Sequence, residues 1–322
     1  MDEFVNHHIP YFYRAHTSWL WPLYIPTCGR AGKAPLLQML NQAPRSVQRR
    51  VHLIVLPEEQ DAYHKAYPWA AMSPPPSEGL GVARFAAINH ARQAGHHRIV
   101  MMDDDIRHLS LLQRIPREGK PPHTRRYSSK VSSISEPEST LRTLGVACTM
   151  ASSLLSGDPE VVYGAARNAL FSGGVDTRVG AKVNGGQFPS CVLFIDVDRY
   201  PVSGLPEAFH FHGEDLAMSL ECLQRRLGWF TLTAVAYDQD GALPSQVPLD
   251  PMTAQGRQID MDNALVHYPK VHQYLKASYK NKLGGVMRIG IRWNQWYKDS
   301  GTTPVTTPMD ELFLLQCPHP VS

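Results

Sequence analysis

Short apolar runs alternate with stretches of helical spacing along the first part of the chain. Trp19–Ile25 and Val51–Leu56 are apolar runs of strand length, and each ends at a proline. Between them, Ala34–Asn41 places its leucines at helical spacing. The order strand, helix, strand predicts the start of an α/β unit.

The same patterns extend through most of the chain. A helix is predicted over Gly79–Ala94, and Arg98–Met102 is predicted to be a buried strand that runs directly into three aspartates. Residues 110–140 are basic and poor in large apolar groups, which predicts a mobile loop. The other predicted elements are helices over Ser139–Leu155, Glu214–Leu227 and Lys270–Lys282, strands over Val161–Leu170, Cys191–Val197 and Trp229–Tyr237, and a loop over Pro244–Gln258.

Composition narrows the class of protein. The 322 residues are 43% hydrophobic and 19% charged, which excludes a disordered chain and a fibre. The net charge of +3 permits a nucleic-acid partner without requiring one. No run of about 18 uncharged apolar residues is present, and the acidic start at Met1–Glu3 is unlike a signal peptide. Because the five cysteines are scattered, we expect reduced thiols and a cytoplasmic location, without membrane attachment.

Asp103, Asp104 and Asp105 form the most informative cluster. Adjacent carboxylates repel one another, and a multivalent cation is the usual remedy. On an extended chain Asp103 and Asp105 point to one side and Asp104 to the other, so one pair can face a common metal. The carboxyl ends of strands are also where ligands bind in open α/β sheets. The alternative interpretation is a solvated turn or a group of helix-capping aspartates.

A second acidic pair, Glu214 and Asp215, precedes the predicted helix that starts there. Its simplest interpretation is a favourable helix N-terminus, where the helix dipole stabilises negative charge. The alternative is a general base that takes a proton from an acceptor hydroxyl. The neighbouring histidines and phenylalanines of Phe209–His212 favour this alternative, since they could line a flat, partly aromatic pocket.

Taken in order, these motifs resemble the metal-dependent glycosyltransferases of the GT-A type. The motifs are a first strand ending in Ile25–Arg30, Arg84 upstream of the strand-end DxD, and a glycine–acid–acid sequence opening a later helix. Within that class the chain is most similar to the phage DNA hydroxymethylpyrimidine glycosyltransferases and the base J glucosyltransferase group. The resemblance covers about residues 20–240.

The resemblance implies a role for each matching residue. Asp103 and Asp105 would hold Mn²⁺ or Mg²⁺ against the diphosphate of a nucleotide-sugar, with a UDP-sugar as the expected donor, and His267 or His272 would supply a late metal ligand. One of Glu214 and Asp215 would be the base of an inverting displacement. The expected donor-binding residues are Thr27, Gly29, Arg30, Arg84, Asp103 and Asp104.

The expected acceptor is a hydroxymethylated pyrimidine in DNA, either 5-hydroxymethylcytosine or 5-hydroxymethyluracil. Lys and Arg of the 114–130 region and of the C-terminal region would neutralise phosphates, and interleaved aromatic side chains could hold an extruded base. Asn184, Gln187 and His212 are the candidate acceptor-binding residues, the two amides because they could hydrogen-bond a pyrimidine edge. The alternative interpretations are a glycan, lipid or protein acceptor, or an inactive DNA-binding module.

The expected architecture is an α/β, GT-A-like (Rossmann-like) mixed sheet flanked by helices. Residues 1–240 would form the catalytic domain, with a nucleotide-sugar half at about 20–110 and an acceptor half at about 140–240. Residues 241–322 would form a helical, basic extension packed on it. Gly79-Leu80-Gly81 does not indicate an NAD site, because Arg84 stands where that fingerprint needs its third glycine.

Overall fold

The structure is a computed structural model that describes residues 21–117, 120–126, 136–168, 180–184, 188–240, 254–280 and 286–308. None of the helices in these ranges has the length and apolar character needed to cross a membrane. The described strands are β1 (Leu23–Pro26), β2 (Val51–Ile54), β3 (Ala71–Ser73), β4 (Arg98–Met102), β5 (Ile106–Arg117), β6 (Lys120–Arg126), β7 (Val161–Asn168), β8 (Gly180–Val183), β9 (Val192–Asp196), β10 (Gly228–Gln239), β11 (Leu275–Lys280), β12 (Val286–Ile291) and β13 (Val305–Pro308).

Most of the described strands form one mixed sheet, as the sequence predicts. Its order is β13-β8-β10-β7-β9-β4-β1-β2-β3, and β5 branches from β10 to pair with β6. Strands β3, β2, β1 and β4 run parallel to one another, whereas β9 lies antiparallel to both β4 and β7. Strands β11 and β12 form a separate antiparallel hairpin.

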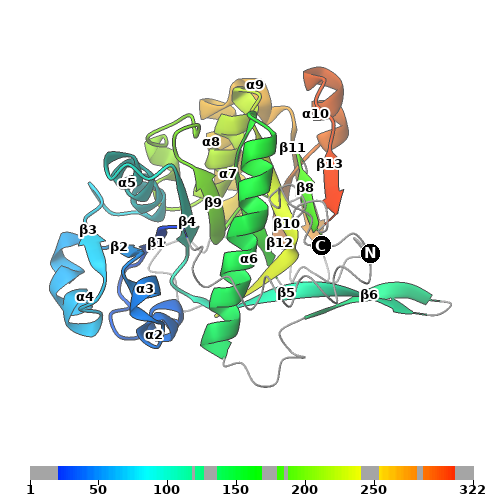
Figure 1. The fold of residues 1–322 in the computed structure, drawn as a ribbon. Helices are drawn as coiled ribbons and strands as arrows, with labels where there is room; N and C mark the ends of the chain where they lie inside the picture. The colour runs from blue at the N-terminus through cyan, green and yellow to red at the C-terminus, as the bar shows by residue number, and fades with distance from the viewer. Residues whose placement is uncertain are drawn as a thin grey trace.

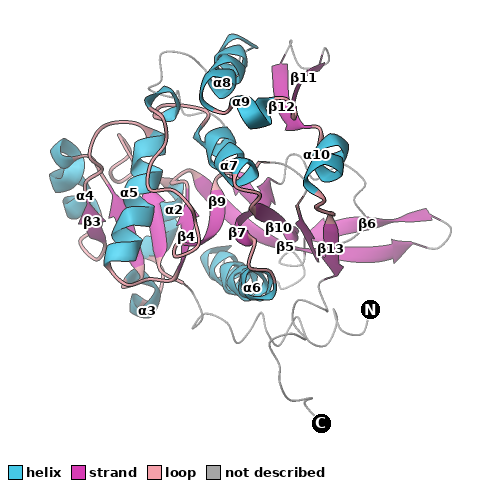
Figure 2. Ribbon diagram, turned by 90° about the horizontal axis from the view of Figure 1, so that it is seen from above, coloured by secondary structure: helices cyan, strands magenta, loops and turns pink. Residues whose placement is uncertain are grey.

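Helices cover both faces of the sheet (Figures 1 and 2). The long helix α6 lies against one face, α5 and α7 lie against the other, and α8 packs outside α7. The described helices are α2 (Pro35–Asn41), α3 (Arg45–Gln48), α4 (Gln60–Ala66), α5 (Leu80–Gln93), α6 (Glu136–Gly157), α7 (Glu214–Gln224), α8 (Ala254–His267), α9 (Pro269–His272) and α10 (Trp293–Ser300), with 3₁₀ turns at Pro57–Glu59 and Glu207–Phe209.

Strand alternation explains why two cores form. Successive side chains of a strand point to opposite faces of the sheet. In β4, Val100 and Met102 pack into the core that contains α6, whereas Ile99 and Met101 pack into the core that contains α5 and α7. A strand buried on both faces is a continuous apolar run, which is the pattern that predicts β4 from sequence.

The prediction of a mobile loop over residues 110–140 is wrong for much of that segment. It contains the antiparallel hairpin β5–β6, which projects from the body of the sheet, and the first turn of α6. Among the described strands β6 pairs with β5 alone, so it is an edge strand, where the prolines Pro121 and Pro122 are tolerated. Residues 118–119 and 127–135 lie outside the described residues.

Two predictions for the C-terminal region are also corrected. The segment Lys270–Lys282 contains the short helix α9 followed by strand β11, not one long helix. The predicted loop over Pro244–Gln258 ends in helix from Ala254 onward, and residues 244–253 lie outside the described residues. Strand β13 returns to the main sheet and pairs with β8.

Candidate active site

The three aspartates after β4 engage three different parts of the fold. Asp103 contacts Arg84 of α5, with Nη2 of Arg84 3.0 Å from Oδ1. Asp104 turns toward the loop after β1, and Asp105 accepts a hydrogen bond from Nε2 of Gln239 at 3.2 Å, at the end of β10. The triplet therefore lies where β1, β4 and β10 end on the same side of the sheet.

Asp104 organises the loop that follows β1. Its carboxylate accepts a hydrogen bond from the hydroxyl of Thr27 at 2.5 Å and forms an ion pair with Nη1 of Arg30 at 2.5 Å. Burial raises the pKa of Asp104, while the bonds from Thr27 and Arg30 oppose that shift. The structure thus brings three of the predicted donor-binding residues into one network, in which Asp104 holds the loop and is itself buried.

Two residues that the sequence did not single out complete this loop. The hydroxyl of Tyr63 lies 2.7 Å from the hydroxyl of Thr27 and accepts the backbone N–H of Arg30. The carboxylate of Glu59 accepts the backbone N–H of Gly29 at 2.8 Å. Gly29 has a φ of 69°, a left-handed conformation that favours glycine. No local sequence signal links Glu59 or Tyr63 to this loop, because about 30 residues separate them from it.

Arg84 lies buried between the two acidic motifs. Its side chain is 2% exposed, and its Nη1 atom lies 3.3 Å from Oε1 of Glu214 while Nη2 contacts Asp103. This guanidinium therefore links the aspartate triplet to the start of α7. The contact with a diphosphate that the sequence suggested stays a prediction, because the contacts present here are with the two carboxylates.

Asp105 has the least satisfied carboxylate of the three. Its Oδ1 atom is buried without a hydrogen-bond partner in the described part of the chain. Burial, together with the charges of Asp103 and Asp104, raises the pKa of Asp105 to about 6. A carboxylate that has an oxygen without a partner, and whose charged form is disfavoured by its surroundings, is suited to bind a cation.

The carboxylate oxygens of Asp103 and Asp105 fit a hard divalent cation whose remaining coordination positions are filled by a bound ligand. Carboxylate oxygens are the ligands that Mg²⁺ and Mn²⁺ prefer. Asp103 and Asp105 both remain partly exposed, and the Oδ1 atom of Asp105 lacks a partner. No group of three or more His, Cys, Asp or Glu side chains that could bind a metal occurs among the described residues, so phosphate oxygens would have to complete the coordination.

His267 is not part of such a group with Asp103 and Asp105. It is an exposed residue at the end of α8, where its ring packs edge-on against Phe209 with centroids 6.0 Å apart. His272, the alternative, is a partly buried residue at the end of α9. The structure therefore does not bring the predicted histidine ligand together with the aspartates.

Glu214 and Asp215 occupy the first turn of α7, as the sequence predicts, but their surroundings differ. Glu214 is 7% exposed and paired with Arg84; burial raises its pKa, and the guanidinium opposes this. Asp215 is partly exposed, and its Oδ1 atom accepts the backbone N–H of Leu216 at 2.8 Å. Glu214 is thus committed to a buried ion pair, whereas Asp215 remains accessible.

His212 lies just before this acidic pair and binds a residue that the sequence did not indicate. Its Nδ1 atom is 2.6 Å from Oδ1 of Asp260, a carboxylate in α8 with no exposed surface. Asp260 also pairs with Arg257 at 3.2 Å. Because 48 residues separate His212 from Asp260, only the tertiary structure reveals this pair.

Asn184 does not join the carboxylates. Its backbone N–H donates to the carbonyl of Trp229, at the start of β10, whereas Asp105 bonds to Asp240 just beyond the end of that strand. The 12 residues of β10 separate these points by on the order of 30 Å. Gln187 lies outside the described residues. The structure therefore does not bring the predicted acceptor-binding residue Asn184 to the aspartates.

The glycines of Gly79-Leu80-Gly81 serve packing. A Cβ atom on Gly79 would lie 2.5 Å from the backbone oxygen of His210, and one on Gly81 would lie 2.5 Å from that of Phe209. The backbone N–H of Gly81 donates to the His210 carbonyl at 2.8 Å. These glycines let the start of α5 pack against the loop before α7, which is consistent with the sequence argument against an NAD site.

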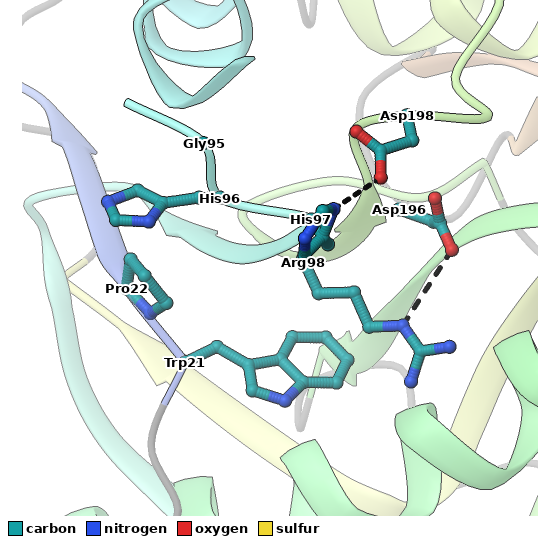
Figure 3. Close-up of a pocket in the computed structure, with 8 residues that line it drawn as sticks. All are labelled: Trp21, Pro22, Gly95, His96, His97, Arg98, Asp196 and Asp198. Carbon is teal, nitrogen blue, oxygen red and sulfur yellow. Dashed lines mark hydrogen bonds and ion pairs between the residues drawn. The ribbon is translucent and has the colours of Figure 1, made fainter. Parts of the chain in front are cut away.

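A pocket of about 580 Å³ lies at the opposite end of β4 (Figure 3). Arg98, the first residue of β4, extends over the ring of Trp21 and toward Asp196. It also donates to the hydroxyls of Ser152 and Ser156. Because Arg98 and Asp103 are five residues apart on an extended chain, this pocket is roughly 16 Å from the aspartates. The charged side chains that line this pocket form ion pairs with one another.

Comparison with known proteins gives the class of enzyme. Residues 21–168 match the family model described as TET-Associated Glycosyltransferase. This range runs from the start of β1 to the end of β7 and contains Thr27, Arg30, Arg84 and the aspartate triplet. None of the curated proteins matches the sequence of this chain.

Solved structures with a similar fold include two sugar transferases. Glucosyl-3-phosphoglycerate synthase from Mycobacterium tuberculosis, in complex with phosphoglyceric acid, is 13% identical over 88% of this chain and 91% of that one, with a TM-score of 0.46. Mannosyltransferase PcManGT from Pyrobaculum calidifontis, in complex with GDP-Man and Mn²⁺, is 14% identical over 86% and 75%, with a TM-score of 0.39. The family match over the strand-end aspartates, together with the mixed sheet described above, makes the chain a glycosyltransferase with a GT-A-like mixed α/β fold.

Proposed function

We propose that the protein transfers a sugar from a nucleotide donor, a UDP-sugar, to the hydroxymethyl group of a modified pyrimidine in DNA. The observation that carries the proposal is the aspartate triplet at the carboxyl end of β4, within the region that matches the glycosyltransferase family. The description of that family, TET-Associated Glycosyltransferase, supports an acceptor among the hydroxymethylated DNA bases. A hydroxymethyl group on a base is therefore the acceptor that the name suggests.

The loop after β1 is the proposed site for the nucleotide. Thr27 and Arg30 are fixed by Asp104, and the backbone of Gly29 is fixed by Glu59. Because these bonds hold the loop in one conformation, little ordering would be required on binding. The cation of Arg30, with 23% of its side chain exposed, is suited to contact the ribose or a phosphate of the donor.

Asp103 and Asp105 would hold the metal. Bound there, Mn²⁺ or Mg²⁺ would neutralise the charge that develops on the departing diphosphate. Arg84 keeps the carboxylate of Asp103 in place, and Gln239 does the same for Asp105. The protein thus presents two hard oxygen ligands that are positioned from opposite sides.

Asp215 is the proposed general base of an inverting displacement. It would accept the proton of the acceptor hydroxyl as that oxygen attacks the anomeric carbon and the bond from this carbon to the diphosphate breaks. Glu214 is less suited to this role, because it is buried and paired with Arg84. Glu214 instead connects the base-bearing helix to the metal-binding aspartate.

The hairpin β5–β6 is the proposed contact with the DNA backbone. It begins directly after Asp105 and projects beyond the body of the sheet (Figure 1). Cations in this position would neutralise phosphates on either side of a base that enters the site. Its sequence carries Arg107, Arg114, Arg117, Lys120, Arg125 and Arg126.

Two measurements test the proposal. The first is the melting temperature with UDP, GDP or dTDP, each with and without Mn²⁺; we expect a metal-dependent rise with one nucleotide, and no rise with any of them would contradict the donor site. The second is mass spectrometry of nucleosides after incubation of DNA with candidate donors. A sugar on 5-hydroxymethylpyrimidine but not on the unmodified base is expected, whereas transfer only to a glycan, lipid or protein would contradict the acceptor assignment.

A further inference from the structure

The loop Ala208–Gly213, called the acceptor loop below, is held between two helices. On one side the start of α5 binds it, since Gly81 donates to the carbonyl of His210. On the other side α8 binds it, since Asn263 donates to the carbonyl of Ala208 at 3.3 Å. The ring of Phe209 also packs against Tyr268, with centroids 5.8 Å apart. A loop held from both sides presents its remaining side chains in fixed positions.

Two side chains of this loop are of chemical interest, the exposed Phe211 and the partly buried His212. Phe211 is 51% exposed, which is unusual for a large aromatic residue in a loop packed on both sides. The side chain of His212 is 15% exposed and uses Nδ1 to bind Asp260, which leaves Nε2 as its second ring nitrogen. An exposed aromatic side chain and a histidine held through one ring nitrogen therefore follow each other in the chain, just before Glu214 and Asp215.

Asp260 is built into the fold at this point. Its side chain has no exposed surface, and its two oxygens contact His212 and Arg257. The carboxylate also approaches the backbone closely: a Cβ atom on Gly213 would lie 2.5 Å from its Oδ1 atom. Gly213 has a φ of 70° and is the residue at which α7 starts, so Asp260 adjoins the turn that places the acidic pair.

We propose that Asp260 is a positioning residue for the acceptor: it holds His212 with Nδ1–H donated to its carboxylate, so that Nε2 accepts a hydrogen bond from an N–H on the edge of the acceptor base, beside the ring of Phe211. This inference rests on the proposed function, because the acceptor is taken to be a planar pyrimidine with a hydroxymethyl group. The pyrimidine ring lies on the face of Phe211, and the hydroxyl faces Asp215, which takes its proton. A flat heteroaromatic ring is the ligand that an exposed phenylalanine beside a fixed hydrogen-bond acceptor suits.

Four variants separate the two parts of the proposal, which are the contact of His212 with the acceptor and the support of His212 by Asp260. His212→Asn keeps an amide nitrogen near the place of Nδ1 and removes Nε2, so we expect an unchanged melting temperature and a KM for hydroxymethylated DNA raised about tenfold. Asp260→Ala removes the support of His212, and a similar rise in KM is expected with a lower melting temperature. Asp260→Asn retains an oxygen that accepts from Nδ1, so its KM should stay within about threefold of the unchanged protein. Asp262→Ala, an exposed residue two positions along α8, is the matched control.

Two further readouts distinguish positioning from general loss of structure. The Kd of the nucleotide should change less than about twofold in all four variants, because none touches the loop after β1. In ¹⁵N-histidine NMR, the proton on Nδ1 of His212 should give a downfield signal that Asp260→Ala abolishes and Asp260→Asn retains. This second readout requires no acceptor.

Different outcomes overturn different claims. A normal KM and kcat in His212→Asn would overturn the contact between His212 and the acceptor. A loss in Asp260→Asn as large as that in Asp260→Ala would overturn positioning through the hydrogen bond. If the unchanged protein modified no hydroxymethylated DNA, the proposed function would fail and the acceptor part of this inference with it. The NMR signal would still decide whether Asp260 holds His212.

Discussion

The two ends of β4 both carry charged clusters, and the clusters differ in how well they are neutralised. At the amino end, Arg98 is satisfied by Asp196, two serine hydroxyls and the ring of Trp21. At the carboxyl end, Asp105 keeps a buried oxygen that has no partner among the described residues, and its pKa is raised to about 6. A fold that satisfies Arg98 at one end and leaves one oxygen of Asp105 unsatisfied at the other indicates where an external cation would bind.

The difference also shows why a pocket alone does not locate the site. The pocket of about 580 Å³ lies at the amino end, where the protein groups already satisfy one another. The carboxyl end lacks comparable internal compensation, and its loops are fixed by buried bonds to Asp104 and Arg84. Here a carboxylate oxygen that lacks a partner and is held by rigid surroundings indicates the catalytic site better than the pocket does.

The largest expected effect comes from comparing one variant at each end of β4. Asp105→Ala should reduce the rate of sugar transfer by at least about 100-fold, since it removes a proposed metal ligand, while the protein stays folded. Arg98→Ala should leave the rate within about threefold and lower the melting temperature by a few degrees. Transfer rates and thermal unfolding of both variants measure this. A normal rate in Asp105→Ala would remove the distinction between the two ends.

The second effect concerns stability at the carboxyl end. Arg84→Ala leaves Asp103 and Glu214 without their shared buried cation, which should lower the free energy of unfolding by about 3–5 kcal/mol. Urea unfolding measures this loss. The double variant Arg84→Ala with Glu214→Ala should recover part of it, because one of the two unpaired carboxylates is then absent. Additive losses in the double variant would show that the bridge between the two motifs is not energetically coupled.

The third effect is a gain of stability on removing a charge. The pKa of Asp105 is raised from 3.8 to about 6 in the folded protein, so the folded state binds this proton more tightly than the unfolded chain. Stability from this group is therefore lost as the pH rises through that interval. Asp105→Asn should raise the urea midpoint at pH 7.5 in metal-free buffer and leave it nearly unchanged at pH 4.

A variant at the amino end of β4 should shift the urea midpoint in the opposite direction and serves as a control. Asp196 accepts hydrogen bonds from the backbone N–H and the side chain of Arg199. Asp196→Asn should therefore lower the midpoint at pH 7.5. If both variants shifted the midpoint in the same direction, the contrast between satisfied and unsatisfied carboxylates would be contradicted.

The smallest effect concerns the histidines that pack between β2 and α5. The rings of His52 and His90 have centroids 4.0 Å apart, and burial with the neighbouring histidines lowers the pKa of His52 to about 4. A neutral His52 therefore favours the folded state, and this contribution is lost as the pH falls from 6.5 to about 4. His52→Gln should show a smaller decline of melting temperature over that interval. The exposed His64→Gln should decline as the unchanged protein does.

The sequence failed wherever a segment depended on distant partners. The basic segment 110–140 is poor in large apolar groups, yet much of it forms a hairpin, because β5 pairs with the end of β10, about 125 residues later. The basic segment Lys270–Lys282 is predicted to be a helix, but its part Leu275–Lys280 pairs with β12 and forms a strand. Local pattern carries no information on such pairings, because the stabilising partner is supplied by the fold.

What the sequence determined by itself is the arrangement that depends on local pattern. Apolar runs of strand length, helical spacing and a strand that runs into three aspartates sufficed for β1, β4, α5 and α7, because these elements bury their own faces. The tertiary structure alone decided the contacts of the charges: Asp104 with Thr27 and Arg30, Arg84 between Asp103 and Glu214, and His212 on Asp260. The physical reason is that the two kinds of information act over different distances along the chain. Periodicity acts over one or two turns of chain, whereas a buried charge is satisfied by whichever group the fold places within about 3 Å of it.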